Sequence, residues 1–264
     1  MAFEHVNIVG LILIFLFIFV FFYFLYKNKR NPNLYIRKIL GIDAISDVCD
    51  YAGETGRPVS FCTGLSSVGP VLYASLGVLS FVAKKAGTFK NRLLIPQYTP
   101  EVMAIVEESV QEAYESINRG SLFDKKDIRF LSDEQFAYAS GYIGMIKRER
   151  ACATFLFGTF AAESLILAEA GQEIGAVQVG ATISPEQVAF FIASCDYTLI
   201  GEELFAASSY LTRKPLEITS IYTQDKVKLF IFFIIIIGSV IATINQIYPD
   251  LNLHNLDYFL TIEI

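Results

Sequence analysis

Histidine and tryptophan are almost missing from this chain of 264 residues. Tryptophan does not occur, and the only histidines are His5 and His254. Both histidines lie outside residues 27–228, the long stretch of mixed composition between two apolar segments. A Ser-His-Asp triad, a Cys-His dyad and a histidine-ligated metal site are therefore excluded from that stretch.

Cysteine is also scarce, and its spacing carries no metal-binding pattern. The four cysteines form no Cys-x-x-Cys pair; they are Cys49, Cys62, Cys152 and Cys195. We expect reduced, buried thiols at these positions. Without paired spacing we expect no structural zinc, and we expect no other metal or cofactor.

Lysine and arginine are absent from both ends of the chain, because all 21 lie between the two apolar segments. The segments run roughly over Asn7–Tyr26 and Leu229–Tyr248, and neither carries a charge. Each is long enough to cross a hydrocarbon core of about 30 Å as a helix. The first lacks a basic leader and an A-x-A-like cleavage site, so we expect a retained anchor.

Charge around the segments predicts their orientation. Basic residues crowd the inner flanks, whereas acidic residues supply the formal charge on the outer flanks, which contain no lysine or arginine. The positive-inside rule, applied to either segment, places residues 27–228 in the cytosol and both termini outside the cell membrane. The expected parts are an outer tail (1–6), a transmembrane helix (7–26), a cytosolic domain (27–228), a second transmembrane helix (229–248) and an outer tail (249–264).

The cytosolic stretch is nearly neutral. It holds 21 basic and 23 acidic residues, since four of the 27 acids lie outside it: Glu4, Asp250, Asp257 and Glu263. Nucleic-acid binding needs a concentrated positive surface, which this balance does not supply. We expect no nucleic-acid partner; the basic flanks suit anionic lipid headgroups.

Residues 27–228 alternate short apolar runs with longer segments of helical period, a pattern typical of βα units around a parallel sheet. The pattern predicts a Rossmann-like three-layer α/β sandwich with a mostly parallel sheet, flanked by the two transmembrane helices. The expected strands are Pro58–Cys62, Arg92–Pro96, Ile128–Leu131, Cys152–Phe157 and Ala176–Val179, with a weaker one at Leu216–Ile221.

The intervening helices have recognisable starts. Thr99-Pro100-Glu101 combines a cap, a proline at the first helical position and an acid. Ser132–Gln135 and Ser184–Gln187 fit the capping-box pattern. Further helices are expected within Asn33–Gly53, Val68–Ala86, Ala161–Ala170 and Glu186–Leu211, the last bent at Gly201.

Three motifs resemble a known family. They are Tyr51–Val59 (YAGETGRPV), Ala161–Ala170 (AAESLILAEA) and Cys195–Thr212 (CDYTLIGEELFAASSYLT), placed between two terminal spans. Together they resemble an uncharacterised prokaryotic membrane-protein family, a domain of unknown function, over most of residues 35–245. The resemblance implies the architecture given above and no activity, so it assigns no catalytic residue.

The best candidate for a ligand site is the turn after the first strand. Phe61–Gly69 (FCTGLSSVG) places small and hydroxyl residues before a helix, where backbone N–H groups can bind a phosphate. Pro70 and Val71 replace the Lys and Ser/Thr of a P-loop, and no G-x-G-x-x-G motif occurs. Two further turns would share this sheet edge. The candidate residues are Gly64, Ser66, Ser67, Thr159 and Thr182, although short turns also need small residues simply to turn.

Other polar groups receive structural interpretations. Glu163 precedes an apolar run near a helix start, where the helix dipole stabilises an acid. Glu202 and Glu203 are adjacent, so they do not share a helix face and cannot act jointly. Cys195 and Asp196 lack a histidine partner, which indicates a buried structural thiol. No catalytic set emerges, and an enzymatic role is not favoured.

The apolar segments predict packing and not transport. Neither contains an ionisable group, and such groups usually mark transport paths. Gly238 and Ala242 form a small-residue pair suited to close helix packing. In the tail, Leu260 and Ile262 belong to an alternating, strand-like pattern that suits addition to a neighbouring subunit or a position in the headgroup region.

These features favour a homo-oligomeric membrane scaffold or ring, with the lipid bilayer, copies of itself and a related membrane subunit as partners. The alternative is a sensor or enzyme that binds a nucleotide or other anionic small molecule at the Gly64–Ser67 edge. A channel formed between subunits ranks last, because only Ser239, Thr243 and Asn245 would supply a polar lining.

Overall fold

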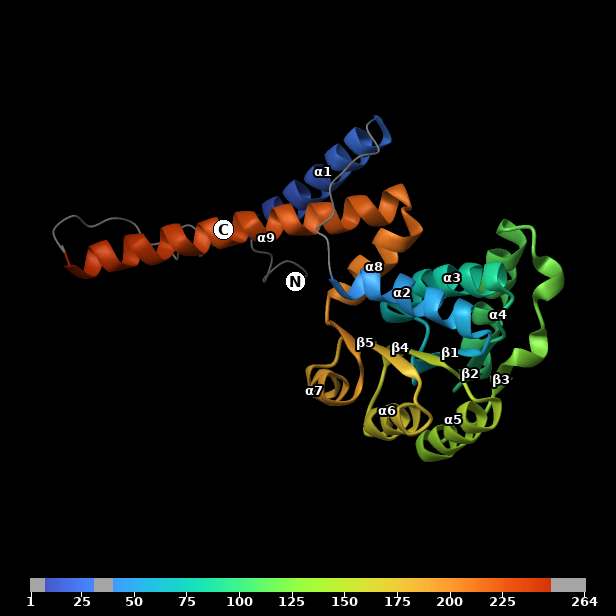
Figure 1. Ribbon diagram of the computed structural model, residues 1–264. Helices are drawn as coiled ribbons and strands as arrows, with labels where there is room; N and C mark the ends of the chain where they lie inside the picture. Colours follow the sequence, from blue (N-terminus) through green and yellow to red (C-terminus); the bar gives the residue numbers. More distant parts are fainter. Residues whose placement is uncertain (1–7, 31–39, 248–264) are drawn as a thin grey trace, which may run out of the picture. The chain divides into compact units, whose positions relative to one another are not determined.

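The computed structural model describes residues 8–30 and 40–247 (Figure 1). The chain divides into two compact units, one of residues 37–213 and one that combines residues 1–36 with 214–264. The predicted tail strand around Leu260 and Ile262 lies outside the described residues, as do both histidines and the first part of the predicted Asn33–Gly53 helices.

The part of the second unit that the structure describes contains two helices, α1 (Ile8–Arg30) and α9 (Pro215–Ile247). They pack through an edge-to-face contact between Phe24 and Tyr222, whose ring centroids lie 5.0 Å apart. Within the described residues one helix, over Pro215–Ile244, is long and apolar enough to cross a membrane, with a mean hydropathy of 2.7. In α1 only a shorter apolar stretch, Phe17–Lys27, is found. The structure thus supports one candidate span, where the sequence predicted two.

The weak strand predicted at Leu216–Ile221 is wrong, because these residues belong to α9. Pro215 stands at the start of the helix, where its missing N–H costs nothing. Ile218, Thr219, Tyr222 and Thr223 recur at helical spacing on one face. That periodicity, and not the short β-branched run, determines the structure here.

The first unit alternates strands and helices along the chain (Figure 1). Its strands are β1 (Val59–Gly64), β2 (Leu93–Gln97), β3 (Ile128–Phe130), β4 (Ala153–Thr159), β5 (Val177–Thr182) and β6 (Tyr197–Ile200). Its helices are α2 (Leu40–Thr55), α3 (Pro70–Phe89), α4 (Pro100–Ser116), α5 (Gln135–Glu149), α6 (Glu163–Glu173), α7 (Pro185–Ser194) and α8 (Glu203–Thr212). Two short 3-10 turns, η1 (Gly120–Leu122) and η2 (Lys125–Asp127), precede β3.

The six strands form one parallel sheet in the order β3-β2-β1-β4-β5-β6. This is the strand order of doubly wound sheets. All strands are parallel, but the direction in which successive strands are added to the sheet reverses between β1 and β4. Helices α2, α3, α4 and α8 cover one face, and α5, α6 and α7 cover the other (Figure 1). The predicted α/β class with a mostly parallel sheet is therefore confirmed.

Each helical layer buries its own core against the sheet. On the face covered by α2 and α3, the Phe61 ring stacks with the rings of Phe155 and Phe157, which are tilted relative to each other, with centroids 5.6 to 6.2 Å apart. On the other face the largest fully buried side chains are Tyr138 and Tyr142. Strands buried on both sides explain why their sequences read as continuous apolar runs.

Five predicted strands are confirmed within a few residues, and β6 was missed. The predicted helix over Glu186–Leu211 is wrong, because α7 ends at Ser194 and α8 begins only at Glu203. The Asp196 carboxylate accepts a hydrogen bond from the Gln178 N–H, 2.8 Å away, which holds the start of β6 beside β5. Tyr197–Ile200 is an aromatic and β-branched run, so strand propensity was readable there.

The predicted helix caps are confirmed in part. Thr99 caps α4, since its hydroxyl accepts a hydrogen bond from the Val102 N–H at 3.4 Å. Ser184 precedes α7 as predicted, but its side chain makes no capping bond. Helix α5 begins at Gln135, and Ser132 instead accepts from the Glu134 N–H at 3.0 Å, so the predicted capping box there is wrong.

Candidate functional site

The candidate site lies where β1 and β4 end, at the point where the strand order reverses. Ligands of open α/β sheets bind in the crevice outside the carboxyl ends of the strands at such a point. Gly64 ends β1 with a φ of +61°, and Thr159 ends β4. The structure therefore brings the predicted residues Gly64, Ser66 and Thr159 together.

The loops that follow β1 and β4 are hydrogen-bonded to each other. The Ser66 hydroxyl donates to the Thr63 carbonyl at 2.6 Å and accepts from the Thr159 N–H at 2.8 Å. The Leu65 N–H donates to the Thr159 carbonyl at 2.8 Å. Ser66 is itself buried. Its hydroxyl thus joins the two loops across the crevice.

Gly64 and Gly158 permit this close approach. A Cβ at Gly64 would collide with the Thr159 carbonyl and the Phe160 ring. A Cβ at Gly158 would collide with the Thr63 carbonyl. Only glycine lets these two backbones lie in contact, which gives the predicted small residues a packing role.

The other two candidate residues differ in their surroundings. Ser67 is exposed. Thr182 is buried, and its hydroxyl accepts from the Ser184 N–H at 3.3 Å. Thr182 ends β5, one strand away from β4. A ligand-binding role for these residues stays a prediction.

We expect Ser66→Ala to lower the free energy of unfolding by about 1.5 kcal/mol, because it leaves the Thr159 N–H without its acceptor and removes one of the two donors to the Thr63 carbonyl. Ser67→Ala, one residue along, should change stability by less than about 0.5 kcal/mol. Thermal unfolding of both full-length variants, followed by circular dichroism, measures the difference. Equal melting temperatures would contradict the bridging role of Ser66.

A buried polar group lies behind this edge, on the face covered by α5 and α6. The Glu163 carboxylate is fully buried and accepts from the Gln135 amide at 2.6 Å and the Ala161 N–H at 3.0 Å. As predicted, Glu163 lies in the first turn of α6. The Cys62 thiol and the Tyr138 hydroxyl are 3.1 Å apart. Burial raises the pKa of Cys62 to about 12 and raises the pKa of Tyr138 well above its ordinary value, so both stay protonated at neutral pH.

Two of the other carboxylates singled out from the sequence accept hydrogen bonds from backbone N–H groups of β5 and β6. Glu203 accepts from the Ile200 N–H at 2.9 Å, and Asp196 accepts from the Gln178 N–H. Cys195, beside Asp196, is partly buried, and burial raises the pKa of its thiol to about 12. These contacts are structural, in agreement with the interpretation of Cys195 and Asp196.

The thiols should be unreactive in the folded protein. Burial raises the pKa of Cys49, Cys62 and Cys195 from 9.0 to about 12, so little thiolate exists at pH 8. The pKa of these thiols is higher in the folded protein than in the unfolded protein. Their contribution to the free energy of unfolding is therefore complete below about pH 9 and declines as the pH rises toward 12. Disulfide-exchange titration at pH 8 should show all four thiols reacting rapidly only after denaturation; rapid reaction of a native thiol would contradict the burial.

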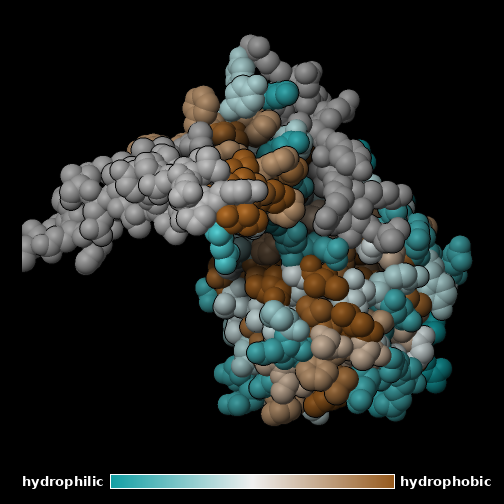
Figure 2. Space-filling view, turned by 90° about the vertical axis from the view of Figure 1, so that its left-hand side faces the viewer, coloured by the Kyte–Doolittle hydropathy of each residue, from teal (hydrophilic) through white to brown (hydrophobic). Residues whose placement is uncertain are grey.

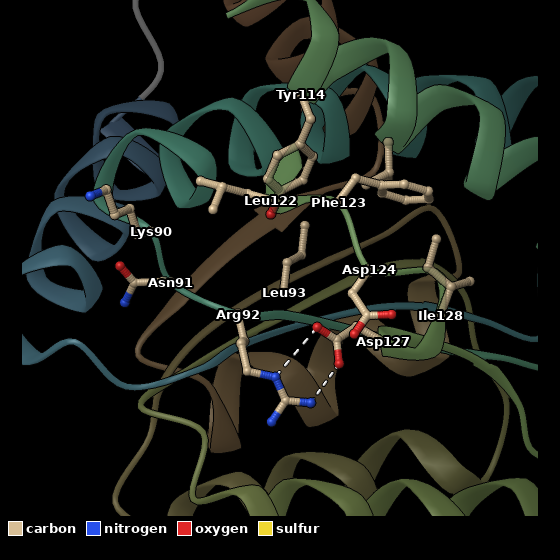
Figure 3. Close-up of a pocket in the computed structure, with 11 residues that line it drawn as sticks. Lys90, Asn91, Arg92, Leu93, Tyr114, Leu122, Phe123, Asp124, Asp127 and Ile128 are labelled. Atoms are coloured by element: carbon tan, nitrogen blue, oxygen red, sulfur yellow. Dashed lines mark hydrogen bonds and ion pairs between the residues drawn. The ribbon is translucent and has the colours of Figure 1, made fainter. Parts of the chain in front are cut away.

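A second hollow, which the sequence did not predict, lies at the opposite edge of the sheet. It is a pocket of about 140 Å³ whose apolar lining comes from Leu93, Val110, Leu122, Phe123 and Ile128. Figure 3 shows Tyr114, Leu122 and Phe123 on one side and Arg92 with Asp127 on the other. In the sequence, Leu122 and Phe123 form an apolar pair within the mostly polar segment 117–127. This pair was the only local sequence signal of the pocket.

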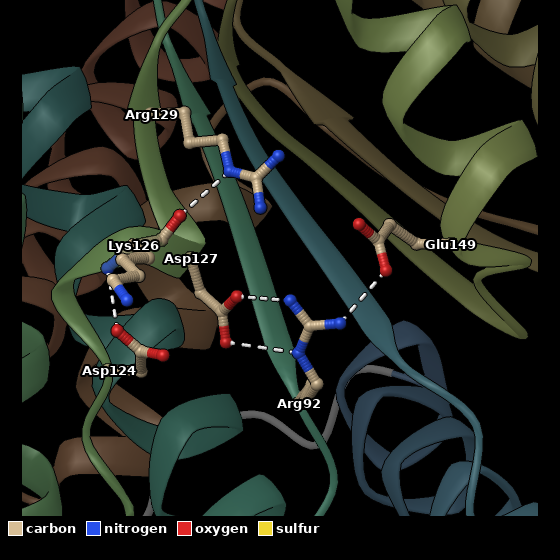
Figure 4. Close-up of polar contacts among 6 residues, drawn as sticks. All are labelled: Arg92, Asp124, Lys126, Asp127, Arg129 and Glu149. Carbon is tan, nitrogen blue, oxygen red and sulfur yellow. Dashed lines mark hydrogen bonds and ion pairs between the residues drawn. The ribbon is translucent and has the colours of Figure 1, made fainter.

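Arg92 organises the charges at this pocket (Figure 4). Its guanidinium contacts both carboxylate oxygens of Asp127, at 2.5 and 3.4 Å, and Glu149 at 2.8 Å. These hydrogen bonds, chiefly the one to Asp127, raise the pKa of Arg92. The arrangement ties the start of β2 to the start of β3 and the end of α5.

The first family-like motif, Tyr51–Val59, also lies at this edge and has a structural role. Arg57 donates to the backbone carbonyls of Arg150 at 3.0 Å and Ala151 at 3.4 Å. The Asn91 amide donates to the carbonyls of Ala52 at 2.6 Å and Arg57 at 2.7 Å. The motif therefore fixes the turn between α2 and β1.

In α9, Gly238 is half-buried and Ala242 is exposed, which leaves their predicted packing role a prediction. Within the described ranges, no group of three or more His, Cys, Asp or Glu side chains is placed to hold a metal ion.

Comparisons with known proteins identify the family alone. No curated protein and no solved structure matches the chain. A family model described as a domain of unknown function, DUF6754, matches residues 1–251. The match covers nearly all of the sequence, so the chain belongs to this domain-of-unknown-function family, DUF6754.

Proposed function

We propose that the protein is an integral membrane protein whose α/β domain builds a homo-oligomeric scaffold or ring. The observation that carries this proposal is the exposure of large apolar side chains in both units. In α9 none of the most apolar window is buried, and side chains such as Phe232 and Ile235 are about 60% exposed. Such surfaces in a folded protein mark contact with lipid or with other subunits.

The membrane part of the proposal rests on α9 and on charge. The apolar part of α9 follows Lys226 and Lys228, and α1 ends in Lys27, Lys29 and Arg30. The positive-inside rule then supports two anchoring helices, both termini outside and residues 27–228 in the cytosol of the cell. The second anchor is an inference from the sequence of the Asn7–Tyr26 segment.

The oligomeric part rests on the α/β unit. On the side that carries α7, Figure 2 shows hydrophobic residues at the surface between hydrophilic ones. Exposed apolar side chains occur at both edges of the sheet. At the carboxyl ends of the strands they are Val68, Tyr73, Phe130, Phe136, Ile183 and Ile200; at the amino ends they are Phe89, Leu122, Ile192 and Tyr197. Apolar centres with polar rims are typical of subunit interfaces.

The runner-up function is binding of a nucleotide or another anionic small molecule by the Rossmann-like three-layer domain at the Gly64–Ser67 turn. It is favoured by the strand order and by the Gln97 amide nitrogen beside the turn, which is buried and has no hydrogen-bond partner among the residues that the structure describes. It ranks second because Ser66 and Thr159 already bind each other. Saturable thermal stabilisation of the full-length protein by such a ligand would reverse the ranking.

Chemical cross-linking in the membrane tests the proposal. After an alkaline carbonate wash the full-length protein should remain in the membrane fraction. An amine-reactive cross-linker should then produce a ladder of bands at multiples of 29.5 kDa. Release by carbonate would contradict the membrane part, and a single 29.5 kDa band at full cross-linker modification would contradict the oligomeric part.

A further inference from the structure

The edge at which the strands end is acidic. The six strand-to-helix loops, taken with the first two residues of each following helix, contain no lysine or arginine. They contain seven carboxylates: Glu101, Asp133, Glu134, Glu163, Glu186, Glu202 and Glu203. Five of these are exposed, whereas Glu163 is buried and Glu203 is half-buried. We call this surface the carboxyl edge.

The opposite edge, here called the amino edge, exposes cations. Lys90, Arg119, Lys126, Arg148 and Arg150 are exposed there, and none forms an ion pair with a described residue. Arg92 holds both Asp127 and Glu149 (Figure 4), whereas the carboxylates of Glu54, Glu115, Asp124 and Asp196 are exposed at this edge. The helix-to-strand loops, taken with the last two residues of each preceding helix, contain eight cations and seven carboxylates, so the amino edge is slightly basic where the carboxyl edge is strongly acidic.

Helix dipoles explain the sign of the charges favoured at each edge, but they do not explain the apolar side chains exposed there. Every helix that follows a strand begins at the carboxyl edge, where an acid is favoured, and runs toward the amino edge, where a cation is favoured. Exposed aromatic side chains gain nothing from a dipole. Yet Phe136 is 61% exposed between the acids of the carboxyl edge, directly after Asp133, Glu134 and Gln135.

The amino edge offers a matching hollow. The apolar pocket between β2, α4 and η1 is lined by Lys90 and Asp124 among others (Figure 3). Lys126, which is exposed, follows Asp124 by two residues, and its backbone N–H donates to the Asp124 carboxylate (Figure 4). The pocket volume of about 140 Å³ suits one aromatic side chain. An exposed aromatic group beside acids on one edge thus has, on the other edge, an apolar pocket of suitable size whose lining includes Lys90 and Arg92.

We propose that copies of the chain associate head to tail, with the carboxyl edge of one α/β unit on the amino edge of the next and Phe136 inserted in the pocket. This rests on the proposed homo-oligomeric function and specifies its interface. Such a contact is heterologous, because it joins two different surfaces. A pair of units therefore still has one free edge of each kind, and repetition of the contact produces a ring or a filament.

Pairing through the sheet edge at β6 is the alternative route to an oligomer, and the structure disfavours it. Strand β6 has only four residues. Its Ile200 N–H is already bound by the Glu203 carboxylate at 2.9 Å. A short edge strand covered by a charged side chain is a common device against edge-to-edge association.

Charge reversal of each edge tests the proposal on the full-length protein in mild detergent. D133K/E134K makes the surroundings of Phe136 basic, and K90E/K126E removes two of the cations near the pocket and makes that part of the amino edge acidic. Each variant alone should associate about tenfold or more weakly than the wild type, because like charges then meet. An equimolar mixture should regain the wild-type mass, since copies of the two variants can alternate. The control K84E/E169K reverses exposed charges away from both edges and should leave the mass unchanged.

The outcomes separate this interface from the proposed function. A monomeric wild type would overturn both. A large wild-type assembly that both edge variants retain would overturn only the head-to-tail contact. Variants that disperse but are not rescued on mixing would also overturn it, and would instead indicate a basic partner of another kind for the carboxyl edge. Rescue on mixing also shows that the variants fold.

An uncharged variant tests the insertion of the aromatic ring. Phe136→Ser should reduce the assembly mass as well, and its salt dependence should match that of the wild type because no charge has changed. Phe190→Ser on α7, which is 39% exposed, serves as the matched control. Equal masses for the two serine variants would overturn the role of Phe136.

Discussion

Replacing Gly64 with alanine should lower the free energy of unfolding by about 4 kcal/mol, the largest single loss that we expect in this protein. Two effects add at this position. Gly64 has a φ of +61°, which costs an L-residue about 1–2 kcal/mol. The new methyl group would also collide with the Thr159 carbonyl, a backbone atom that moves only if the β1 and β4 loops separate.

Gly56 provides a matched control for the backbone effect. Its φ is +66°, and nothing lies within 4 Å of a Cβ built on it. Gly56→Ala should therefore cost only about 1 kcal/mol. Thermal unfolding by circular dichroism should show a drop of about 10 °C for Gly64→Ala and about 3 °C for Gly56→Ala. Equal drops would show that the two loops do not lie in tight contact.

Removing the Glu163 carboxylate should be the second most damaging change. Glu163→Ala removes a fully buried carboxylate and leaves the partly buried Gln135 amide and Ala161 N–H without an acceptor. Unsatisfied buried donors cost about 1–3 kcal/mol each, and we expect a loss of about 3 kcal/mol. Glu163→Gln keeps one oxygen acceptor and should recover about half of that loss.

Glu169, on the same helix α6, is exposed and serves as the control. Glu169→Ala should change the free energy of unfolding by less than about 0.5 kcal/mol. The four proteins, including the wild type, are compared by thermal unfolding in the same detergent. If Glu163→Ala is as stable as Glu169→Ala, the buried carboxylate does not organise the start of α6.

Local sequence signals predicted most of the sheet, because the strands are buried on both faces. Apolar runs such as Cys152–Phe157 are unmistakable when helix caps and glycines bound them. Strand β6 was missed although Tyr197–Ile200 has strand propensity, because a run of only four residues did not outweigh the helical pattern on either side of it. What holds it is the Asp196 contact with Gln178, a long-range bond that no local pattern encodes.

The candidate site was predictable in place but not in detail. Parallel strands bring Gly64 and Thr159 to one edge, so their proximity followed from the βα pattern alone. The Ser66 hydroxyl looked equally available to a phosphate and to the neighbouring loop. Its two bonds depend on how closely β1 and β4 approach, which is a property of the assembled sheet.

The amino-edge pocket lay beyond sequence reasoning for a similar reason. Its walls come from residues far apart in the chain, such as Leu93, Tyr114 and Phe123. The Arg92 contacts that border it join β2 to η2 and to α5. Only the segment around Leu122 carried a local hint, an apolar pair within a polar loop.

The mass of the full-length protein in mild detergent, measured by light scattering, tests the central claim most directly. The account predicts a discrete particle of many times the 29.5 kDa chain mass, and images of the same sample should show a ring or filament. A monomer at micromolar concentration would contradict it and would turn attention to ligand binding beside Gly64.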